Sequence, residues 1–268
     1  MHLIGTPSAE RLFRAARGMS VPVIAFSMVT TPIGRRRDDA PAAVGPDGGA
    51  HVAERPTIGI FGAGKVGTAL ARLLVDAGYE VALAGSPRQT ALELLVSVVA
   101  PGARVADSAR LADESDVIVV AVPFGKAPTV PWDAFDGKVV VDATNYWPPV
   151  DGHIPEVDAD ERTTSEILAA LNPAARVVKS LNHLGYHDME DDPMPPGSPL
   201  RRAIAVVGDD ADAREAVARI IDDLGFDPVD GGALGNGRAL EPGHPAFGRE
   251  LSARELASLL EAERAVAA

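Results

Sequence analysis

The sequence predicts an α/β fold with a doubly wound parallel sheet and a small C-terminal α/β domain. From Thr57 onward, short apolar strands alternate with helical patterns, which is typical of a parallel sheet covered by helices on both faces. The first strand also runs directly into three closely spaced glycines, Gly62, Gly64 and Gly67, and these open an amphipathic helix. Strand, glycines and helix in this order are typical of the Rossmann fold and predict a dinucleotide site.

Each of the three glycines has a separate expected role. Gly62 permits the tight turn after the strand, Gly64 lets the backbone approach a pyrophosphate, and Gly67 lets the helix pack closely against the strand. The helix is predicted over 66–77, where apolar residues recur at helical spacing, and Gly78 follows as its C-terminal cap. Its amino end offers free N–H groups and the positive end of the helix dipole to a phosphate. The alternative is a purely structural βαβ turn.

The end of the second predicted strand, 80–84, indicates which dinucleotide is bound. An NAD site would place an Asp or Glu about 20 residues after the glycines, to hold the ribose 2′-hydroxyl. This chain has Ser86 and Arg88 there instead, a hydroxyl and a guanidinium that suit a 2′-phosphate. We therefore expect NADP(H). The alternative is that Arg88 is a solvated residue at the start of a helix.

The remaining predicted elements follow in order along the chain. They are helix 90–99, strand 104–106, strand 117–122, strand 139–145, helix 164–171, strand 176–182, strand 202–207, helix 211–224, strand 226–229 and helix 253–266, which Ser252 is expected to cap. The carboxyl ends of the central strands should face the ligand. The segments 148–162 and 186–198 are rich in acids and prolines, which favours surface loops.

Composition excludes several classes of protein. At 268 residues and 46% hydrophobic the chain can bury a full core, and its net charge of −13 opposes binding to nucleic acid or to an anionic membrane. No apolar run approaches the roughly 20 residues of a spanning helix. Without cysteine there is no disulfide and no thiolate ligand, so a cytoplasmic location is expected. With only 4% aromatic residues, Trp132 and Trp147 are expected to pack within the protein rather than to stack on a ligand.

The domain organisation is expected to have three parts. Residues 1–56 are rich in arginine, proline and glycine, which favours a poorly ordered N-terminal extension with only a weak likeness to a signal or transit peptide. Met19 or Met28 is a possible alternative start. The predicted Rossmann domain covers 57–182, and a small C-terminal domain, 183–268, is expected to complete the site.

Four stretches carry a resemblance to a known family. They are Gly62 to Gly67 with Ser86, Val120 to Pro123, Val141 to Trp147 with Val178 to His183, and Gly225 to Gly248. Through them the chain resembles the NADPH-dependent reductases of the deazaflavin coenzyme F420. The resemblance implies a Rossmann domain with a small C-terminal domain, a dimer, and hydride exchange between NADPH and the deazaflavin, with coenzyme F420 as co-substrate.

The resemblance also implies the site residues. They are Gly62, Ala63, Gly64, Lys65, Val66 and Gly67 around the pyrophosphate, Ser86 and Arg88 at the 2′-phosphate, Ala121, Val122 and Pro123 beside the nicotinamide, and Asn145, Leu181 and Asn182 near the two rings. Asn145 and Asn182 would position the rings through their amides. The chain departs from the family where Pro87 separates serine from arginine, and where His183 replaces a small hydroxyl residue.

Several polar residues remain outside this set. His183 and His187 lie four residues apart, and Gly185 between them favours a turn, so a surface loop is expected rather than a metal site, with a donor to the acceptor substrate as the alternative. No metal is expected.

Three basic residues, Lys179, Arg201 and Arg202, are expected to be solvated, or alternatively to cradle the acidic tail of the deazaflavin. Asp142 and Glu241 are open to two interpretations, hydrogen-bonded structural carboxylates or groups that handle protons.

The function predicted from these features is that of an NADP(H)-dependent oxidoreductase that exchanges hydride with a deazaflavin. One alternative keeps the fold and changes the acceptor to a flavin, a ferric complex or a cyclic imine. Another is a redox sensor that binds NADP without turnover. A homodimer is expected, with no nucleic-acid or membrane partner.

Overall fold

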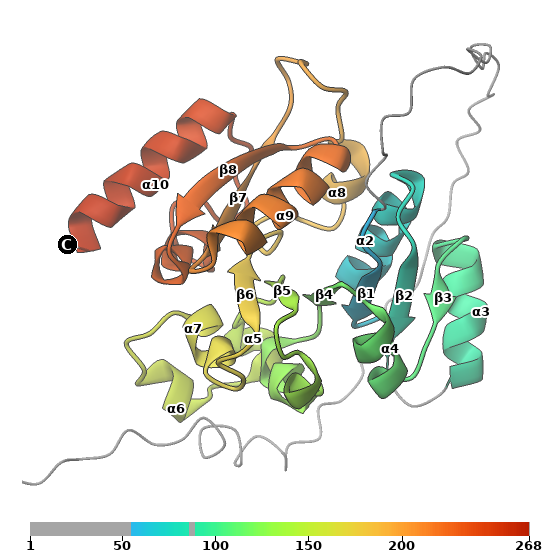
Figure 1. The fold of residues 1–268 in the computed structure, drawn as a ribbon. Helices are drawn as coiled ribbons and strands as arrows, with labels where there is room; N and C mark the ends of the chain where they lie inside the picture. Colours follow the sequence, from blue (N-terminus) through green and yellow to red (C-terminus); the bar gives the residue numbers. More distant parts are fainter. Residues whose placement is uncertain (1–54, 86–88, 268) are drawn as a thin grey trace, which may run out of the picture.

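The computed structural model describes residues 55–85 and 89–267, and its centre is an eight-stranded sheet with the order β3-β2-β1-β4-β5-β6-β7-β8 (Figure 1). The strands are β1 (Ile58–Phe61), β2 (Val81–Ala84), β3 (Arg104–Val105), β4 (Val117–Val120), β5 (Val139–Asp142), β6 (Arg176–Lys179), β7 (Ala203–Gly208) and β8 (Asp227–Gly232). The first six strands pair in parallel, in the order typical of a Rossmann sheet. The predicted α/β class is confirmed.

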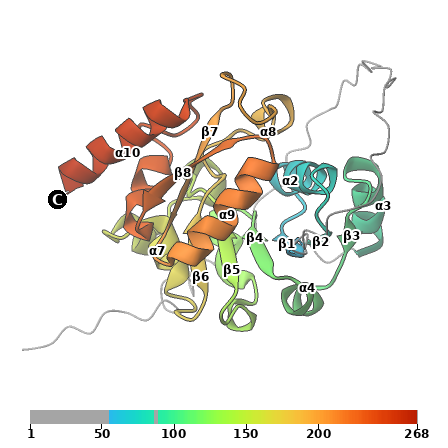
Figure 2. The ribbon, with the colours of Figure 1, turned by 45° about the horizontal axis from the view of Figure 1, so that its top comes forward.

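Helices cover both faces of this sheet. They are α2 (Lys65–Asp76), α3 (Gln89–Val99), α4 (Ser108–Glu114), α5 (Pro148–Asp151), α6 (Pro155–Asp158), α7 (Thr164–Ala169), α8 (Asp188–Asp191), α9 (Ala211–Asp223) and α10 (Ala253–Ala267), with short 3-10 helices η2 (Phe124–Thr129), η3 (Trp132–Ala134) and η4 (Leu234–Leu240). Alternate strand residues point to opposite faces. One face packs on α2 and α9 (Figure 2), the other on α4 and α7.

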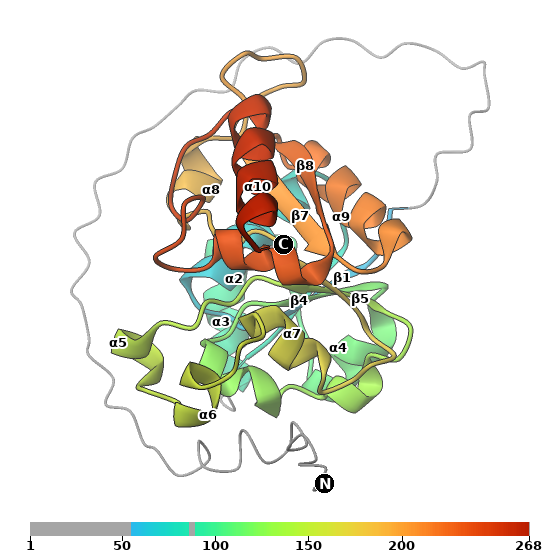
Figure 3. The same cartoon turned by 90° about the vertical axis from the view of Figure 1, so that its left-hand side faces the viewer.

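The C-terminal part of the chain extends the same sheet. β7 pairs antiparallel with β6, and β8 pairs in parallel with β7. α10 lies across these two strands (Figure 3), where Leu256 and Leu260 belong to a separate apolar cluster with Ala205 and Val207. Ser252 caps α10 as predicted, since its hydroxyl accepts from the Glu255 N–H at 3.4 Å. The domain boundary placed at residue 182 stays a prediction.

Three predicted strands end two or more residues early, one of them the strand predicted over 176–182, which ends at Lys179. The strand predicted to reach residue 122 ends at Val120, and the one predicted to reach residue 145 ends at Asp142. An apolar residue indicates burial, and a residue can be buried against the sheet without pairing with a neighbouring strand. The apolar sequence therefore continues beyond the end of the paired strand. The residues that follow each strand are therefore free to line a ligand site at the carboxyl edge.

The loop predicted over 148–162 is instead partly helical. It contains α5 and α6, each a single turn that begins with proline, at Pro148 and Pro155. Proline suits the first helical position because its φ is already helical and its missing N–H would be unpaired there. One turn is too short to show helical periodicity in the sequence, which is why the prediction was wrong.

Two of the predicted features cannot be compared with the structure. Residues 1–54 of the predicted extension, and Ser86, Pro87 and Arg88 of the predicted 2′-phosphate site, lie outside the described residues. Arg55 is described, and its guanidinium donates to the Ala77 carbonyl at 2.6 Å.

Among the described residues, no helix is both long and apolar enough to span a membrane.

Candidate functional site

The three glycines after β1 adopt the geometries predicted for them. Gly62 has a φ of +119°, and a side chain there would meet the Ala121 carbonyl. A Cβ on Gly67 would lie 1.8 Å from the Gly62 carbonyl oxygen, so helix and loop pack too closely for any side chain. Gly64 is different, because no heavy atom of the described residues lies within 4 Å of its Cβ position. The loop therefore leaves open space at Gly64 and nowhere else among the three.

This open space adjoins the amino end of α2. Gly64 is the N-cap of the helix, and no side chain from residues 55–85 or 89–267 caps its free N–H groups. An anion in front of Gly64 would meet both these donors and the positive end of the helix dipole. Lys65 adds a charge nearby; its ammonium donates to the Tyr186 hydroxyl at 3.0 Å and lies 4.9 Å from the ring centroid.

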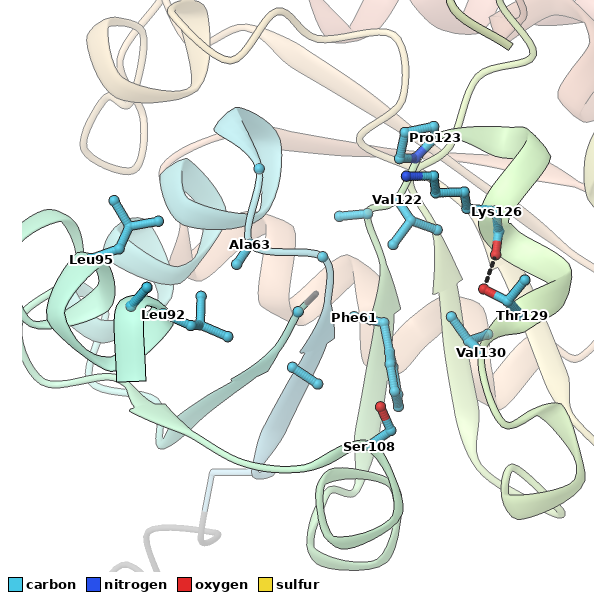
Figure 4. A pocket seen from close by; sticks show the side chains of 16 residues that line it. Phe61, Ala63, Leu92, Leu95, Ser108, Val122, Pro123, Lys126, Thr129 and Val130 are labelled. Atoms are coloured by element: carbon cyan, nitrogen blue, oxygen red, sulfur yellow. Dashed lines mark hydrogen bonds between the residues drawn. The ribbon is translucent and has the colours of Figure 1, made fainter. Parts of the chain in front are cut away.

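A pocket of about 590 Å³ opens beside the glycine loop (Figure 4). Its lining comes from the ends of β1 and β2, from the glycine loop, from α3, and from the segment 121–130 that follows β4. Leu92 and Leu95 of α3 face Val130 across it (Figure 4), so two apolar walls enclose a slot. Ser108 contributes a hydroxyl. This combination of apolar walls and a few polar groups is typical of a small-molecule site.

Lys126 is the basic residue of this lining, and the sequence analysis missed it. It is exposed, and among the described residues no carboxylate forms an ion pair with its ammonium. Lys126 lies three residues after Pro123, on the loop that leaves the carboxyl end of a central strand. Because ligands of such sheets bind at that edge, its position was a usable signal.

The structure brings together most of the residues expected around the nicotinamide and the pyrophosphate. Ala63, with Gly62 and Gly64, lines the pocket, and so do Ala121, Val122 and Pro123 from the next strand along the sheet. The Ala121 N–H donates to the Phe61 carbonyl at 2.8 Å, which holds the two strand ends side by side. Lys65, Val66 and Gly67 form the first turn of α2 and are not part of the lining.

Asn145 and Asn182 are joined by their side-chain amides at the carboxyl ends of β5 and β6. Nδ2 of Asn145 donates to the Asn182 carbonyl at 2.6 Å, and Nδ2 of Asn182 donates to Oδ1 of Asn145 at 3.0 Å. A third bond, 2.7 Å, runs from Asn182 to the Leu240 carbonyl. Leu181, the residue before Asn182, has a φ of +65°, a conformation that is strained for leucine. Backbone strain of this kind is concentrated at functional sites in proteins.

A buried ion pair lies beneath the two asparagines. Asp142 and Lys179 are both 0% exposed, and their charged atoms are 3.1 Å apart. Asp142 also accepts from Thr144 and Ser165, and the Lys179 ammonium donates to the Thr144 carbonyl at 2.6 Å. The expectation that Lys179 is solvated is wrong, because the carboxylate at the end of the neighbouring strand compensates its charge inside the protein. Of the two interpretations of Asp142, the hydrogen-bonded structural one fits.

Arg201 and Arg202 are also buried, at 6% and 5% exposed. Arg201 pairs with Asp222 at 2.6 Å, and Arg202 pairs with Asp188 at 3.0 Å and Asp192 at 2.8 Å. The prediction of solvated side chains is wrong for both. Since their guanidinium groups already bind internal carboxylates, neither is available as a cradle for an acidic ligand.

His183 is buried as well, which corrects the prediction of a surface loop. It is 3% exposed, and its Nε2 accepts from the Ala205 N–H at 3.3 Å. Burial lowers the pKa of its imidazole to about 3, and the positive charges of Arg202 and Lys179 act in the same direction. His187 is exposed. In the part of the chain that the structure describes, no group of three or more His, Cys, Asp or Glu residues could hold a metal ion.

Glu241 and the two tryptophans complete the predicted residues. Glu241 accepts from the N–H and the hydroxyl of Thr164 at 2.7 and 2.6 Å, a structural contact at the start of α7. Trp132 is buried, and its indole N–H donates to the Ala127 carbonyl at 2.8 Å, so it packs as predicted. Trp147 also packs against another side chain, the ring of Phe247, but 42% of the residue stays exposed to solvent.

Part of the chain that forms this site is similar to a known family of proteins. Residues 57–146, which include the glycine loop, the loop after β4 and Asn145, match the sequence model described as NADP oxidoreductase, coenzyme F420-dependent. Over these residues the chain is similar to that family. The fold is of the Rossmann type, as the resemblance implied, and the match supports an NADP-dependent oxidoreductase.

Individual relatives agree with this assignment. Metalloreductase STEAP3 of Rattus norvegicus is 29% identical over 70% of this chain, but the chain spans only 36% of the length of that protein. Among solved structures, the hypothetical protein SMa0349 of Sinorhizobium meliloti is 29% identical, with a TM-score of 0.65 over 73% of this chain and 94% of the other. A protein of Arthrobacter sp. FB24, provisionally named an F420-dependent NADP-reductase, is 25% identical, with a TM-score of 0.57 over 69% of this chain and 88% of the other.

Proposed function

We propose that this NADP-dependent oxidoreductase exchanges hydride between NADPH and a deazaflavin of the coenzyme F420 type. The observation that carries the proposal is the continuity of one edge of the sheet. The lining of the pocket beside Gly64 includes Val122 and Pro123, which follow β4, and the Asn145–Asn182 pair follows the next two strands, β5 and β6. One edge thus offers a place for a dinucleotide and, directly beside it, polar groups for a second ring. The family description names NADP and coenzyme F420 together.

The described residues fit a dinucleotide. Gly64 leaves open space before an uncapped helix, as a pyrophosphate requires. The slot between Leu92 and Val130 suits the adenosine half, with the Lys126 ammonium as a counter-charge for phosphate. The nicotinamide would then reach past Val122 toward Asn145. Ser86 and Arg88 stay the proposed contacts to the 2′-phosphate.

The chain's contribution to the reaction is to hold two rings together. When bound, NADPH supplies a hydride, and the oxidised deazaflavin that accepts it also takes up one proton from solvent, so that NADP⁺ and the reduced deazaflavin result. Positioning of this kind provides much of the rate and requires no nucleophile. Asn145 is the half-buried polar group available for that purpose, and Asn182, which is 4% exposed and donates to Asn145 and to the Leu240 carbonyl, holds it in place from behind.

A second acceptor is favoured by one observation. The relative STEAP3 is named a metalloreductase, and it shares 29% identity over 70% of this chain. A ferric complex is therefore the second candidate, although the matched region is only 36% of that protein. Both candidates use the same NADPH site and differ only in what accepts the electrons.

The test uses the purified full chain. Mixed with NADPH and oxidised deazaflavin, it should bleach the visible absorbance of the deazaflavin, and NADH should be a poorer donor. Parallel reactions with FMN and with a ferric chelate separate the acceptors. Bleaching of FMN alone, or reduction of the ferric chelate alone, would reject the deazaflavin. Tight NADPH binding without turnover of any acceptor would indicate a redox sensor instead.

A further inference from the structure

Two aromatic rings from distant parts of the chain lie against each other near the proposed acceptor site. Trp147 directly precedes α5, and Phe247 lies between η4 and α10. Their ring centroids are 6.0 Å apart with an angle of 25° between the planes, which is a stacked arrangement. Trp147 is nevertheless 42% exposed. A large aromatic side chain that is held in place and still open to solvent is suited to bind a ligand ring.

The segments that carry these two rings also carry the Asn145–Asn182 pair. Asn145 lies two residues before Trp147. On the other side, the N–H of Gly248, the residue after Phe247, donates to the carbonyl of His183, the residue after Asn182, at 3.1 Å. Figure 3 shows α5 and the loop between η4 and α10 on the same side of the molecule. The aromatic pair therefore lies beside the amide pair.

A carboxylate attaches Trp147 to the pocket proposed for NADPH. Asp151 accepts from the Trp147 N–H at 2.8 Å through one oxygen, and from the Gly125 N–H at 2.9 Å through the other. Gly125 belongs to the loop that lines the pocket from Pro123 onward. The rings of Phe124 and Tyr146 lie 5.5 Å apart across the same two loops. The position of Trp147 is thus set relative to the pocket, and not only relative to Phe247.

We propose that the Trp147–Phe247 pair is the stacking surface for the planar tricyclic ring of the electron acceptor. This inference rests on the proposed function and names the residues that receive its second ring. Deazaflavins and flavins share the chemistry that such a surface recognises, a flat aromatic system, with carbonyl and ring nitrogen groups on its edge for the neighbouring amide of Asn145, which the buried Asn182 holds in place. A ferric chelate has no such ring and would gain nothing from the surface.

The first test measures the KM for the acceptor and the KM for NADPH in the same variant. Trp147→Leu should raise the KM for the tricyclic acceptor about tenfold, the size expected for loss of one aromatic stacking contact. The KM for NADPH and the turnover with a ferric chelate should not change. Trp147→Tyr should restore most of the acceptor KM, and Leu200→Ala, which alters another exposed apolar residue, should have no effect. Equal KM values in the wild type and Trp147→Leu, for both deazaflavin and FMN, would overturn the proposal.

The second test needs no turnover, so it stands even if the proposed function fails. The chain has two tryptophans, of which Trp132 is buried and Trp147 is exposed. Titration with oxidised deazaflavin, and separately with FMN, should quench the fluorescence of the wild type, and Trp147→Leu should lose both the quenching and the tight binding. Unchanged ligand binding in Trp147→Leu would contradict stacking. A shift from dimer to monomer in Trp147→Leu, with acceptor binding unaltered, would show that the surface is an interface between two copies of the chain.

Discussion

The ammonium of Lys179 and the carboxylate of Asp142 lie 3.1 Å apart inside the protein, each residue being completely buried. They sit at the carboxyl ends of β5 and β6, in register with each other. Through its bond to the Thr144 carbonyl, Lys179 also holds the backbone directly before Asn145. A structural ion pair thereby supports Asn145, which is proposed to face the substrate, and the buried Asn182 bonded to it.

Breaking this pair should destabilise the fold. In Lys179→Met the Asp142 carboxylate would be buried without its counter-charge, which costs about 3–5 kcal/mol. Urea unfolding of the variant and the wild type measures this difference in the free energy of unfolding. The double variant Lys179→Met with Asp142→Leu removes both charges and should recover part of the loss. A single variant as stable as the wild type would show that the charge pair contributes little.

The glycine loop allows a matched pair of substitutions. Gly64→Ala adds a methyl group where no atom in the described part of the chain lies within 4 Å, so the protein should fold normally, but the methyl should intrude on a bound pyrophosphate. We expect about a tenfold loss of NADPH affinity, or about 1.4 kcal/mol. Gly67→Ala would place its methyl against the Gly62 carbonyl and should lower the melting temperature instead. Thermal unfolding and NADPH titration distinguish the two effects. Normal NADPH affinity in Gly64→Ala would place the pyrophosphate elsewhere.

Lys126 should contribute to NADPH binding through its charge. Lys126→Met keeps the length of the side chain and removes the ammonium, which should weaken NADPH binding several-fold because a charge-assisted contact to phosphate is lost. The salt dependence of the affinity should become shallower as well. Arg254→Met, which removes an exposed charge on α10, is the control and should change neither quantity. An unchanged affinity in Lys126→Met would exclude this contact.

The buried His183 should make the protein less stable in mild acid. Its pKa is about 3 when folded, against about 6.5 in an unfolded chain. Between these values the unfolded state binds the extra proton, so the free energy of unfolding falls as the pH is lowered, by up to about 1.4 kcal/mol per pH unit. From pH 6.5 to pH 5 this group should cost about 2 kcal/mol.

The measurement is urea unfolding at the two pH values, with His183→Gln as the comparison. Glutamine keeps a hydrogen-bond acceptor for the Ala205 N–H but does not titrate, so the variant should lose less stability between pH 6.5 and pH 5. Identical pH dependence in both proteins would mean that His183 is accessible to protons in the folded state.

The sequence predicted best where the physical cause is local. The turn at Gly62 requires a positive φ, and the helix after Gly64 shows its period within its own residues, so both were recognisable without any knowledge of distant contacts. The same holds for the buried strands of the parallel sheet, whose continuous apolar runs identify them. Their ends were predicted less well, because the last ladder bond of β4 or β5 depends on the neighbouring strand.

The sequence did not predict which groups the polar and aromatic side chains contact. Charge alone suggested that Arg201 is solvated, and only the fold brings Asp222 against it, 21 residues further along the chain. Asp151 shows no local sign that its carboxylate would join the Trp147 segment to the loop at Gly125.

By itself, then, the sequence determined that this chain has a Rossmann-type sheet and a glycine loop shaped for a dinucleotide, because periodicity and backbone conformation are properties of neighbouring residues. Only the tertiary structure decided that His183 is buried, that Lys126 faces the pocket, and that Trp147 stacks on Phe247 while staying open to solvent. Burial and pairing depend on segments that are far apart in the chain, and these meet only once the sheet has formed.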